Sequence, residues 1–497
     1  MTSIDTAATP ADTTTLDPRR WKALAVIAIA QLMVVLDATI VNIALPSAQR
    51  ALHISTADRQ WVVTAYTLAF GGLLLLGGRI ADFMGRKRMF IVGLLGFAVA
   101  SALGGLSQSA GMLFGARALQ GAMGALMAPA ALSLISVTFT EAKERATAFG
   151  VYGAIAGGGA ALGLILGGVL TEYVSWRWCL LVNAPVAVFA AVAGSRIVRE
   201  SRAHGDTHYD LPGAAAVTAG LVSLVYGFTM ADQHGWSSAT TLSFLGAAVV
   251  LLAAFITIEL RTSHPLLPMR VLLDRNRGGS FLGSFMAGTG LFGMFLFLTY
   301  YLQGTLGYSA LKSGFAFLPF SAGIVIGAGF ASKVLPRVGP RPLMGGGFLA
   351  SAAGAAWFTR IGIHSSYLVH VLPAEVVMSV GMGFAFVALS STALIGVGDH
   401  DAGVASALVN TTQQVGGSLG TALLNTIAAS ATTGYLATHA ASATRTSQSL
   451  VHGYTIAFAY TAGSLLLAAI ASIALVRATR QNVASVAGTE GNAVVMA

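Results

Sequence analysis

Fourteen long apolar runs are the feature that most limits what this chain of 497 residues can fold into. A helix needs about 20 mostly apolar residues to cross the hydrocarbon core of a bilayer. The runs are 22–46, 58–79, 89–107, 110–136, 146–170, 177–197, 211–230, 239–259, 279–302, 313–331, 343–361, 367–395, 403–427 and 454–476. We therefore predict an all-α polytopic membrane protein with 14 transmembrane helices.

The composition agrees with this prediction. Hydrophobic residues make up 55% of the chain and charged residues only 9%, whereas soluble domains carry about 25% charged residues. The 59 glycines suit membrane helices, because small residues let helix backbones approach closely. The single cysteine, Cys179, excludes an intramolecular disulfide and a thiolate metal cluster.

The basic residues indicate the orientation. With an even number of spans both termini lie on one side, and most of the 28 Lys and Arg residues fall in loops on that side. Cations gather in the cytoplasmic loops of membrane proteins, so we predict a multi-pass protein of the cell membrane with both termini cytoplasmic. The net charge of +9 therefore reflects contact with a lipid bilayer and not with nucleic acid.

A charged loop, residues 77–88 with the sequence GGRIADFMGRKR, joins the second and third runs. Its glycines let the backbone turn sharply. Its carboxylate is expected to cap a helix start and to meet a cation across the bundle. A simple positively charged anchor is the alternative, but an anchor needs only the cations. The loop residues that we expect to act together are Gly78, Asp82, Gly85, Arg86, Lys87 and Arg88.

A second copy of this loop lies at residues 332–341, SKVLPRVGPR. Gly339 aligns with Gly85 and Arg341 with Lys87, whereas Pro336 stands where the first copy has Asp82. Such a repeat indicates two related halves of six spans with one pair of spans inserted between them. We predict a disordered cytoplasmic tail at 1–20, a six-helix bundle at 21–197, a linker with two extra spans at 198–278, a second six-helix bundle at 279–476, and a cytoplasmic tail at 477–497.

The loop at 77–88 resembles the loop between spans two and three of the major facilitator superfamily. Five further segments resemble its branch of fourteen-span drug:proton antiporters. They are Leu36 to Pro46, Gln60 to Tyr66, Arg117-x2-Gln120-Gly121, Trp176 to Pro185, and the Gly403 to Gly417 stretch with Asn410, Gln413 and Gln414. The resemblance implies a major facilitator fold, a cytoplasmic gate latched by the loop at 77–88, and a fourth-span Arg linked to proton coupling.

The fifth run departs from that family's pattern. The antiporters carry a Gly-Pro pair there, whereas this chain has Leu164 in place of the proline. Small residues at four-residue spacing still form a flat face for close helix contact. These antiporter-type packing residues are Gly159, Gly163, Gly167 and Gly168. An importer or a proton symporter of a small metabolite therefore stays open as the alternative function.

Asp37 and Arg117 are the strongest candidates for proton coupling. Asp37 lies about 22 Å into the first span, at 1.5 Å per residue, and Arg117 also falls in the outer half of its span. A charge at this depth costs roughly 2.5–3.5 kcal/mol, so it must be paired, hydrated or protonated. Burial favours the neutral acid, which suits Asp37 to accept a proton. A purely structural ion pair is the alternative.

Glu375 is a second intramembrane acid, about 12 Å deep in the twelfth span and two residues after Pro373. We interpret it as a cavity acid that contributes to proton coupling. The alternative is that its side chain reaches the outer interface. Because the chain has no P-loop and no set of nucleophiles or metal ligands, we predict no enzyme activity, no cofactor, and a proton gradient as the energy source.

Polar side chains at membrane depth are the candidates for a substrate cavity. Asn410, Gln413 and Gln414 share one helical face. The full set is Gln31, Asn42, Tyr66, Gln120, Asn410, Gln413 and Gln414. We therefore predict a proton-coupled exporter of lipophilic or cationic small molecules such as antibiotics, which works as a monomer by alternating access.

Overall fold

The computed structural model describes residues 18–139, 141–202, 210–263, 265–267, 269–396 and 399–480. Most of the predicted N-terminal tail and the C-terminal tail from residue 481 lie outside these residues. All regular elements in the described part are helical. The first seven are α1 (Arg20–Ala51), α2 (Trp61–Met84), α3 (Arg86–Gly105), α4 (Ala110–Thr138), α5 (Ala142–Tyr173), α6 (Trp178–Leu181) and α7 (Asn183–Ile197).

Three helices follow in the middle of the chain, namely α8 (Leu211–His234), α9 (Ala239–Arg261) and α10 (Met269–Leu272). The last group includes two π-helical turns, η1 and η2. It consists of α11 (Arg275–Tyr300), η1 (Tyr301–Thr305), α12 (Ala310–Ala316), α13 (Leu318–Val338), α14 (Pro340–Phe358), η2 (Tyr367–Val371), α15 (Leu372–Leu394), α16 (Asp399–Thr438) and α17 (Arg445–Leu475).

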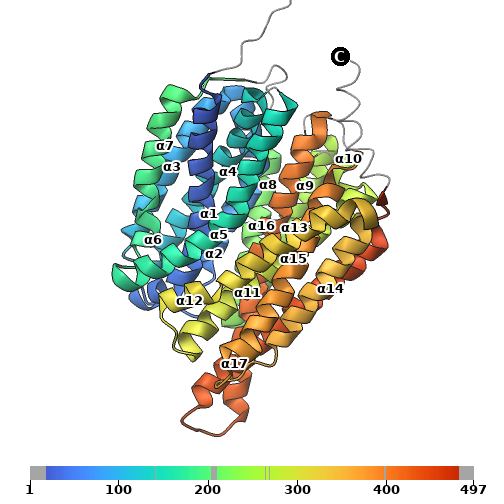
Figure 1. Ribbon diagram of the computed structural model, residues 1–497. Helices are drawn as coiled ribbons and strands as arrows, with labels where there is room; N and C mark the ends of the chain where they lie inside the picture. Colours follow the sequence, from blue (N-terminus) through green and yellow to red (C-terminus); the bar gives the residue numbers. More distant parts are fainter. Residues whose placement is uncertain are drawn as a thin grey trace, which may run out of the picture.

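Each predicted apolar run coincides with one helix or with two consecutive helices. Within the described residues, ten helical segments are long and apolar enough to cross a membrane, and α2, bent by 55°, makes eleven. The helices α5, α14 and α16 do not meet this criterion, and the apolar part of α5 is only Gly159–Tyr173. They nevertheless run alongside the other spans in the bundle (Figure 1).

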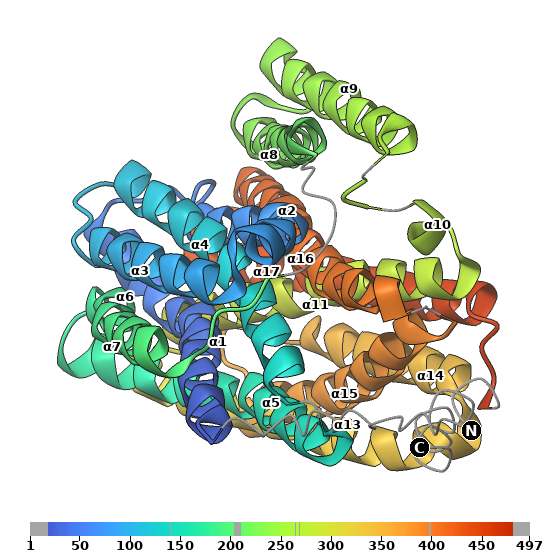
Figure 2. The same cartoon turned by 90° about the horizontal axis from the view of Figure 1, so that it is seen from above.

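Two bundles stand side by side, α1–α7 and α11–α17, and a helical hairpin of α8 and α9 lies outside them (Figure 2). Helix α8 packs on α2 and α16, whereas α9 packs mainly on α8. This arrangement has the predicted order of six, two and six spans. The exact division of the chain into five segments stays a prediction.

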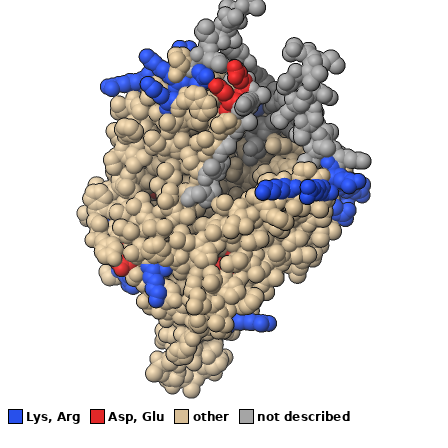
Figure 3. Space-filling model, viewed as in Figure 1, with Lys and Arg blue, Asp and Glu red and all other residues tan. Residues whose placement is uncertain are grey.

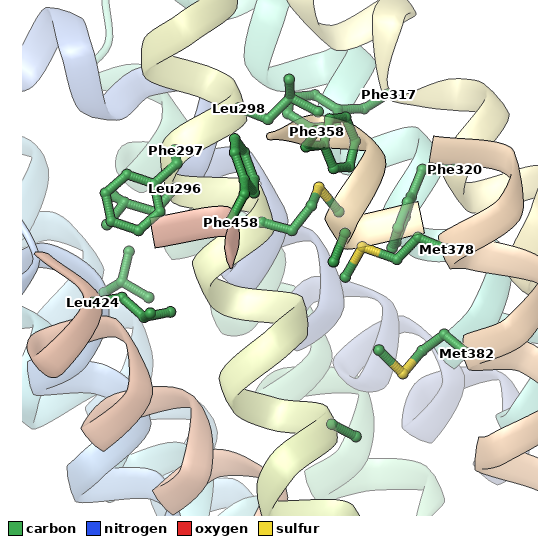
Figure 4. Close-up of a cluster of buried hydrophobic side chains, with 14 of the residues drawn as sticks. Leu296, Phe297, Leu298, Phe317, Phe320, Phe358, Met378, Met382, Leu424 and Phe458 are labelled. Atoms are coloured by element: carbon green, nitrogen blue, oxygen red, sulfur yellow. The ribbon is translucent and has the colours of Figure 1, made fainter. Parts of the chain in front are cut away.

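The core of the second bundle is built from aromatic and methionine side chains. Figure 4 shows Phe358 and Phe458 in one cluster with Met378, with Met382 further along the same cluster, and the rings of Phe358 and Phe458 stack at 4.8 Å. All four side chains are fully buried. Since apolar area removed from water stabilises a protein by about 25 cal/mol per Å² but gains little against lipid, close packing must contribute most of the cohesion here.

The helices α16 and α17 extend further than the apolar runs at 403–427 and 454–476. Their ends form a hairpin that projects from the bundle at the bottom of Figure 1. An apolar run predicts only the part of a helix that lies in the hydrocarbon core, and the helix itself can continue through polar residues outside the membrane. Pro373, two residues before Glu375, does not interrupt a helix interior. It lies in the first turn of α15, where its missing N–H costs nothing, directly after the π-helical turn η2.

Candidate functional site

Asp37 and Arg117 form an ion pair inside the first bundle. Asp37 lies in the middle of α1 and Arg117 in the first half of α4. A guanidinium Nη1 of Arg117 donates to Asp37 Oδ2 at 2.6 Å, and the two side chains are 1% and 0% exposed. The predicted pairing is therefore confirmed. Because a buried charge is stable only with a close partner, each residue needs the other to remain in this position.

Three polar side chains complete the surroundings of Asp37. Its Oδ1 accepts hydrogen bonds from Gln120 Nε2 at 3.0 Å and from Asn183 Nδ2 at 2.8 Å. Gln120 also accepts from Arg117 at 2.9 Å and donates to Ser101 Oγ at 2.7 Å. Every member of this set is at least 98% buried. We call Asp37, Arg117, Gln120, Asn183 and Ser101 the acid cluster.

The acid cluster is built from four helices of the first bundle and contacts a fifth, α2. Asp37 comes from α1, Ser101 from α3, Arg117 and Gln120 from α4, and Asn183 from the start of α7. Arg117 Nε also donates to the carbonyl oxygen of Val62 on α2 at 2.9 Å. Its guanidinium lies 4.5 Å from the ring centre of Tyr66, a cation–π contact. A change of charge at Asp37 would therefore act on most of this bundle at once.

Gln120 and Tyr66 were predicted to line a substrate cavity, and the structure places them in and beside the acid cluster. Both are at most 1% exposed, so neither faces an opening in this conformation. Asn183 stood in a motif of the sixth run without a predicted role, and Ser101 had no sequence signal. Only the three-dimensional packing of the bundle brings Asn183 to Asp37 and Ser101 to Gln120.

Glu375 lies apart from the acid cluster, in the first turn of α15 in the second bundle. Its side chain is fully buried, so the alternative that it reaches the outer interface is wrong. Tyr367 Oη donates to Glu375 Oε2 at 3.2 Å, and Oε1 has no hydrogen-bond partner among the described residues. No described cation pairs with it. The two acids predicted to couple protons, Asp37 and Glu375, therefore have different surroundings, because Asp37 is ion-paired and Glu375 is not.

The remaining polar candidates for the substrate cavity differ in how exposed their side chains are. Asn42 is buried and donates to the carbonyl of Ala38 in its own helix at 3.0 Å, whereas Gln31 is half-buried. On α16, Asn410 is exposed and Gln413 and Gln414 are half-buried. This face of α16 packs between the two bundles, because Gln414 approaches Gly71 of α2 and the Gln413 carbonyl approaches Gly288 of α11.

The loop at 77–88 turns at Gly85, whose φ of +111° lies in the region that favours glycine. Asp82 Oδ1 pairs with Arg86 Nε at 2.8 Å within the loop itself. The expectation that Asp82 caps a helix and meets a cation across the bundle is therefore wrong for this conformation. Gly78 does permit close contact, since a Cβ there would lie 3.3 Å from Pro129 of α4.

Glu200, which the sequence did not single out, caps α3 instead. It follows α7, and its carboxylate accepts the backbone N–H groups of Lys87 at 3.0 Å and Arg88 at 3.2 Å. Lys87 Nζ donates to the carbonyl of Ser195 at 2.7 Å. A carboxylate at a helix N-terminus satisfies unpaired N–H groups and interacts favourably with the helix dipole. The loop is thereby fixed to the end of its own bundle.

The glycines of α5 pack in two directions. Gly159, Gly163 and Gly167 face α1. Gly168 instead faces α12 of the other bundle, where a Cβ would lie 2.6 Å from the Cα of Leu311. A Cβ on Gly314 of α12 would likewise lie 2.5 Å from the carbonyl oxygen of Leu164. The position that departs from the antiporter pattern thus forms part of a tight contact between the bundles.

Further contacts close the same end of the molecule. Buried Arg59 donates to Asn425 Oδ1 at 3.0 Å and lies 4.0 Å over the ring of Tyr300. Asn425 in turn donates to Gln60 Oε1 at 2.9 Å. Figure 3 shows basic side chains and a hollow between the bundles at the opposite end. We call the end with the Arg59, Gly168 and Gly314 contacts the closed end, and the opposite end, with the basic side chains, the basic end.

Two helical bundles, closed against each other at one end and with a buried ion-paired carboxylate inside one of them, define a secondary transporter. The chain belongs to the major facilitator superfamily, whose family description, "Major Facilitator Superfamily", matches residues 27–421. It is accordingly a multi-pass membrane transporter and not an enzyme.

Named relatives cover most of the chain. The puromycin resistance protein pur8 of Streptomyces alboniger is 52% identical over 463 residues, which is 93% of this chain and 92% of that protein. The cephamycin export protein CmcT of Amycolatopsis lactamdurans is 38% identical over 83% of this chain and 86% of its own. The multidrug efflux pump LfrA of Mycolicibacterium smegmatis is 32% identical over 84% of this chain and 82% of its own.

The fold also matches a solved structure. It is a bacterial homolog to the human lysosomal transporter Spinster, in an inward-facing and unoccupied conformation. The TM-score is 0.65, with 94% of this chain and 98% of that chain covered. At 16% sequence identity this likeness concerns the fold alone.

Proposed function

We propose that this protein exports drug-like small molecules, antibiotics among them, in exchange for protons. The observation that carries the export is the 52% identity with a puromycin resistance protein along nearly the whole of both chains. The relatives that export cephamycin and several drugs support the same activity. Puromycin is therefore the first substrate to test.

The basic end is the cytoplasmic end in this proposal. It carries Arg20, the cations of the loop at 77–88, and both ends of the described chain. An excess of Lys and Arg marks cytoplasmic loops. The hollow between the bundles then opens to the cytoplasm, from which an exporter takes its substrate. One copy of the chain contains both bundles, so we propose that a monomer of the cell membrane transports.

The acid cluster is the proposed site of proton coupling. Ionised Asp37 accepts three hydrogen bonds, from Arg117, Gln120 and Asn183. A proton on Asp37 removes the negative charge that compensates Arg117 and turns one acceptor into a donor. The helices that supply these partners must then repack. In this proposal the repacking closes the open end of the molecule and opens the other end. Glu375 is the second candidate acid.

The half-buried and exposed polar groups Gln31, Asn410, Gln413 and Gln414 are proposed to meet the substrate as it enters between the bundles. They lie on α1 and α16, one helix from each bundle. Asn42, whose amide is satisfied inside its own helix, has a secondary place in this proposal. Drug-sized ligands are commonly held by apolar walls with a few such polar groups.

The test uses the full chain in inside-out vesicles. An acidic lumen should drive puromycin uptake into these vesicles, and an ionophore should abolish the uptake while ATP is held constant. Uptake that survives the ionophore would contradict proton coupling. Accumulation in right-side-out vesicles, driven by an acidic exterior, would favour the importer or symporter alternative.

A further inference from the structure

The two copies of the charged loop turn in a similar way, each at a glycine with positive φ. Gly85 ends α2 and begins α3 with φ of +111°, and Gly339 ends α13 and begins α14 with φ of +82°. Each glycine therefore permits the same sharp turn at the basic end of its bundle. The repeat seen in the sequence is a repeat in three dimensions.

The two copies differ in how their cations are compensated. Arg86 in the first copy pairs with Asp82, and Glu200 adds a second carboxylate. The second copy has Pro336 where the first has its acid. Its three cations, Lys333, Arg337 and Arg341, are exposed, and their side chains make no hydrogen bond or ion pair with any described residue. The second copy thus presents three positive charges without an anion.

An apolar groove begins at Val338 and Pro342, which are the sequence neighbours of Arg337 and Arg341. It has a volume of about 340 Å³ and lies between α13, α14 and α15. Its walls include Val338, Leu343, Gly346, Ala350, Val380 and Phe384. From Pro342 to Ala350 the groove follows α14 for about 12 Å, at 1.5 Å per residue. It therefore leads from the charged interface toward the middle of the membrane.

We propose that this groove and its three cations bind an anionic phospholipid. The phosphate would meet Lys333, Arg337 and Arg341, and one acyl chain would lie along the groove against Leu343 and Phe384. Basic pockets between transmembrane helices on the cytoplasmic side are typical places for acidic lipid headgroups. The lipid supplies the anion that Asp82 and Glu200 supply in the first copy. This inference does not depend on which substrate is exported.

The geometry favours a lipid over a free anion. A free phosphate would need only the cations, whereas the adjoining groove is lined by apolar side chains and is long enough for part of an acyl chain. Gly346 leaves part of the groove open, because a Cβ there would meet no atom within 4 Å. The site has cations at the interface followed by an apolar groove, just as a phospholipid has a charged headgroup followed by apolar acyl chains.

The test measures the thermal unfolding midpoint of the delipidated full-length protein while phosphatidylglycerol or phosphatidylcholine is added in mixed micelles. Phosphatidylglycerol should stabilise the protein at lower concentration. The variant Arg337→Gln/Arg341→Gln should weaken this response about 30-fold, since each cation near an acidic headgroup contributes roughly a fivefold change in affinity. The response to phosphatidylcholine should not change.

Two control variants make the result specific. Arg196→Gln/Arg261→Gln removes two exposed cations at the basic end of α7 and α9, away from the groove, and should keep the lipid preference. Gly346→Leu should fill the groove and weaken phosphatidylglycerol binding, whereas Gly463→Leu, at another open helical glycine, should not.

Three results would overturn the proposal. The wild-type protein could show no preference for phosphatidylglycerol, or the Arg196/Arg261 variant could lose the preference as completely as the Arg337/Arg341 variant. Alternatively, inorganic phosphate could stabilise the protein as well as the lipid does, with Gly346→Leu unaffected. The last result would identify a simple anion site.

Discussion

The two bundles follow one plan of six spans but place their charges differently. The first bundle contains a buried ion pair, Asp37 with Arg117, and neutralises its loop with Asp82 and Glu200. The second contains the buried acid Glu375, which has no ion-pair partner among the described residues, and carries exposed cations at its loop. The second bundle therefore repeats the helices and the turning glycine of the first bundle but not its carboxylates. We infer that proton coupling resides in the first bundle and that the second mainly moves against it.

The largest expected effect is that of Asp37→Asn. The variant should still fold but with lower stability, because the amide oxygen can accept the hydrogen bond from Arg117 while the buried guanidinium loses its counter-charge. It should still bind puromycin but lose all accumulation driven by a pH gradient, since it no longer exchanges a proton. The matched variant in the second bundle is Glu375→Gln, which should keep gradient-driven transport. Vesicle uptake and puromycin binding measured on both variants would check this.

Variants of Arg117 distinguish a role of the ion pair in proton coupling from a role in stabilising the fold. Arg117→Ala leaves a buried carboxylate unpaired, and breaking such a pair costs about 3–5 kcal/mol, so this variant should express poorly. The double variant Asp37→Asn/Arg117→Gln should express again but remain uncoupled. If coupling instead survives in Asp37→Asn and disappears in Glu375→Gln, the comparison of the two bundles must be reversed.

The next largest effect should come from Asp82→Asn in the first loop. The partly exposed pair of Asp82 with Arg86 contributes about 1 kcal/mol at most, so turnover should fall only several-fold. The affinity for puromycin should not change, because the loop lies at the basic end and outside the acid cluster. Lost affinity with normal turnover would show that the loop does not act as a gate. Pro336→Asn, at the aligned position of the second loop, is the control.

The sequence predicted most of the fold because apolar length and turn residues are local properties. All 14 predicted runs are helical, and the pairing of Asp37 with Arg117 is present. The acid cluster was only partly predictable. Asn183 reaches Asp37 through the packing of α7, and Ser101 reaches Gln120 through the packing of α3, and no local sequence pattern predicts such contacts. The capping role of Glu200 could not be predicted for the same reason, because the helix that it caps begins more than 100 residues earlier in the chain.

A smaller effect is expected from Glu200→Gln. The carboxylate accepts two backbone N–H groups at the start of α3, and loss of a cap of this kind costs about 1 kcal/mol. The unfolding midpoint should fall by a few degrees, and high salt should reduce the difference from wild type because the charge is exposed. No equivalent acid caps α14 among the described residues. A Glu200→Gln variant as stable as wild type would remove this difference between the two loops.

The smallest effect concerns Glu144, which joins α5 to α1 at the basic end. Arg20 Nε donates to its Oε2 at 2.7 Å. This hydrogen bond holds the pKa of Glu144 below its ordinary value of 4.5. Because the pKa is lower in the folded protein, the pair stabilises the fold above pH 4.5, and this contribution is lost as the pH falls through the folded value.

Glu144→Gln should therefore lower the unfolding midpoint slightly at pH 7, and its difference from wild type should disappear in acid. Arg20→Gln should give the same pH profile, since either change removes the pair. In a surface pair the two side chains are partly hydrated, so the effect at pH 7 must be smaller than that of the acid cluster. A difference that persists below the folded pKa would mean that Glu144 stabilises α5 by packing and not by its charge. The charges that hold the first bundle together would then be confined to its interior.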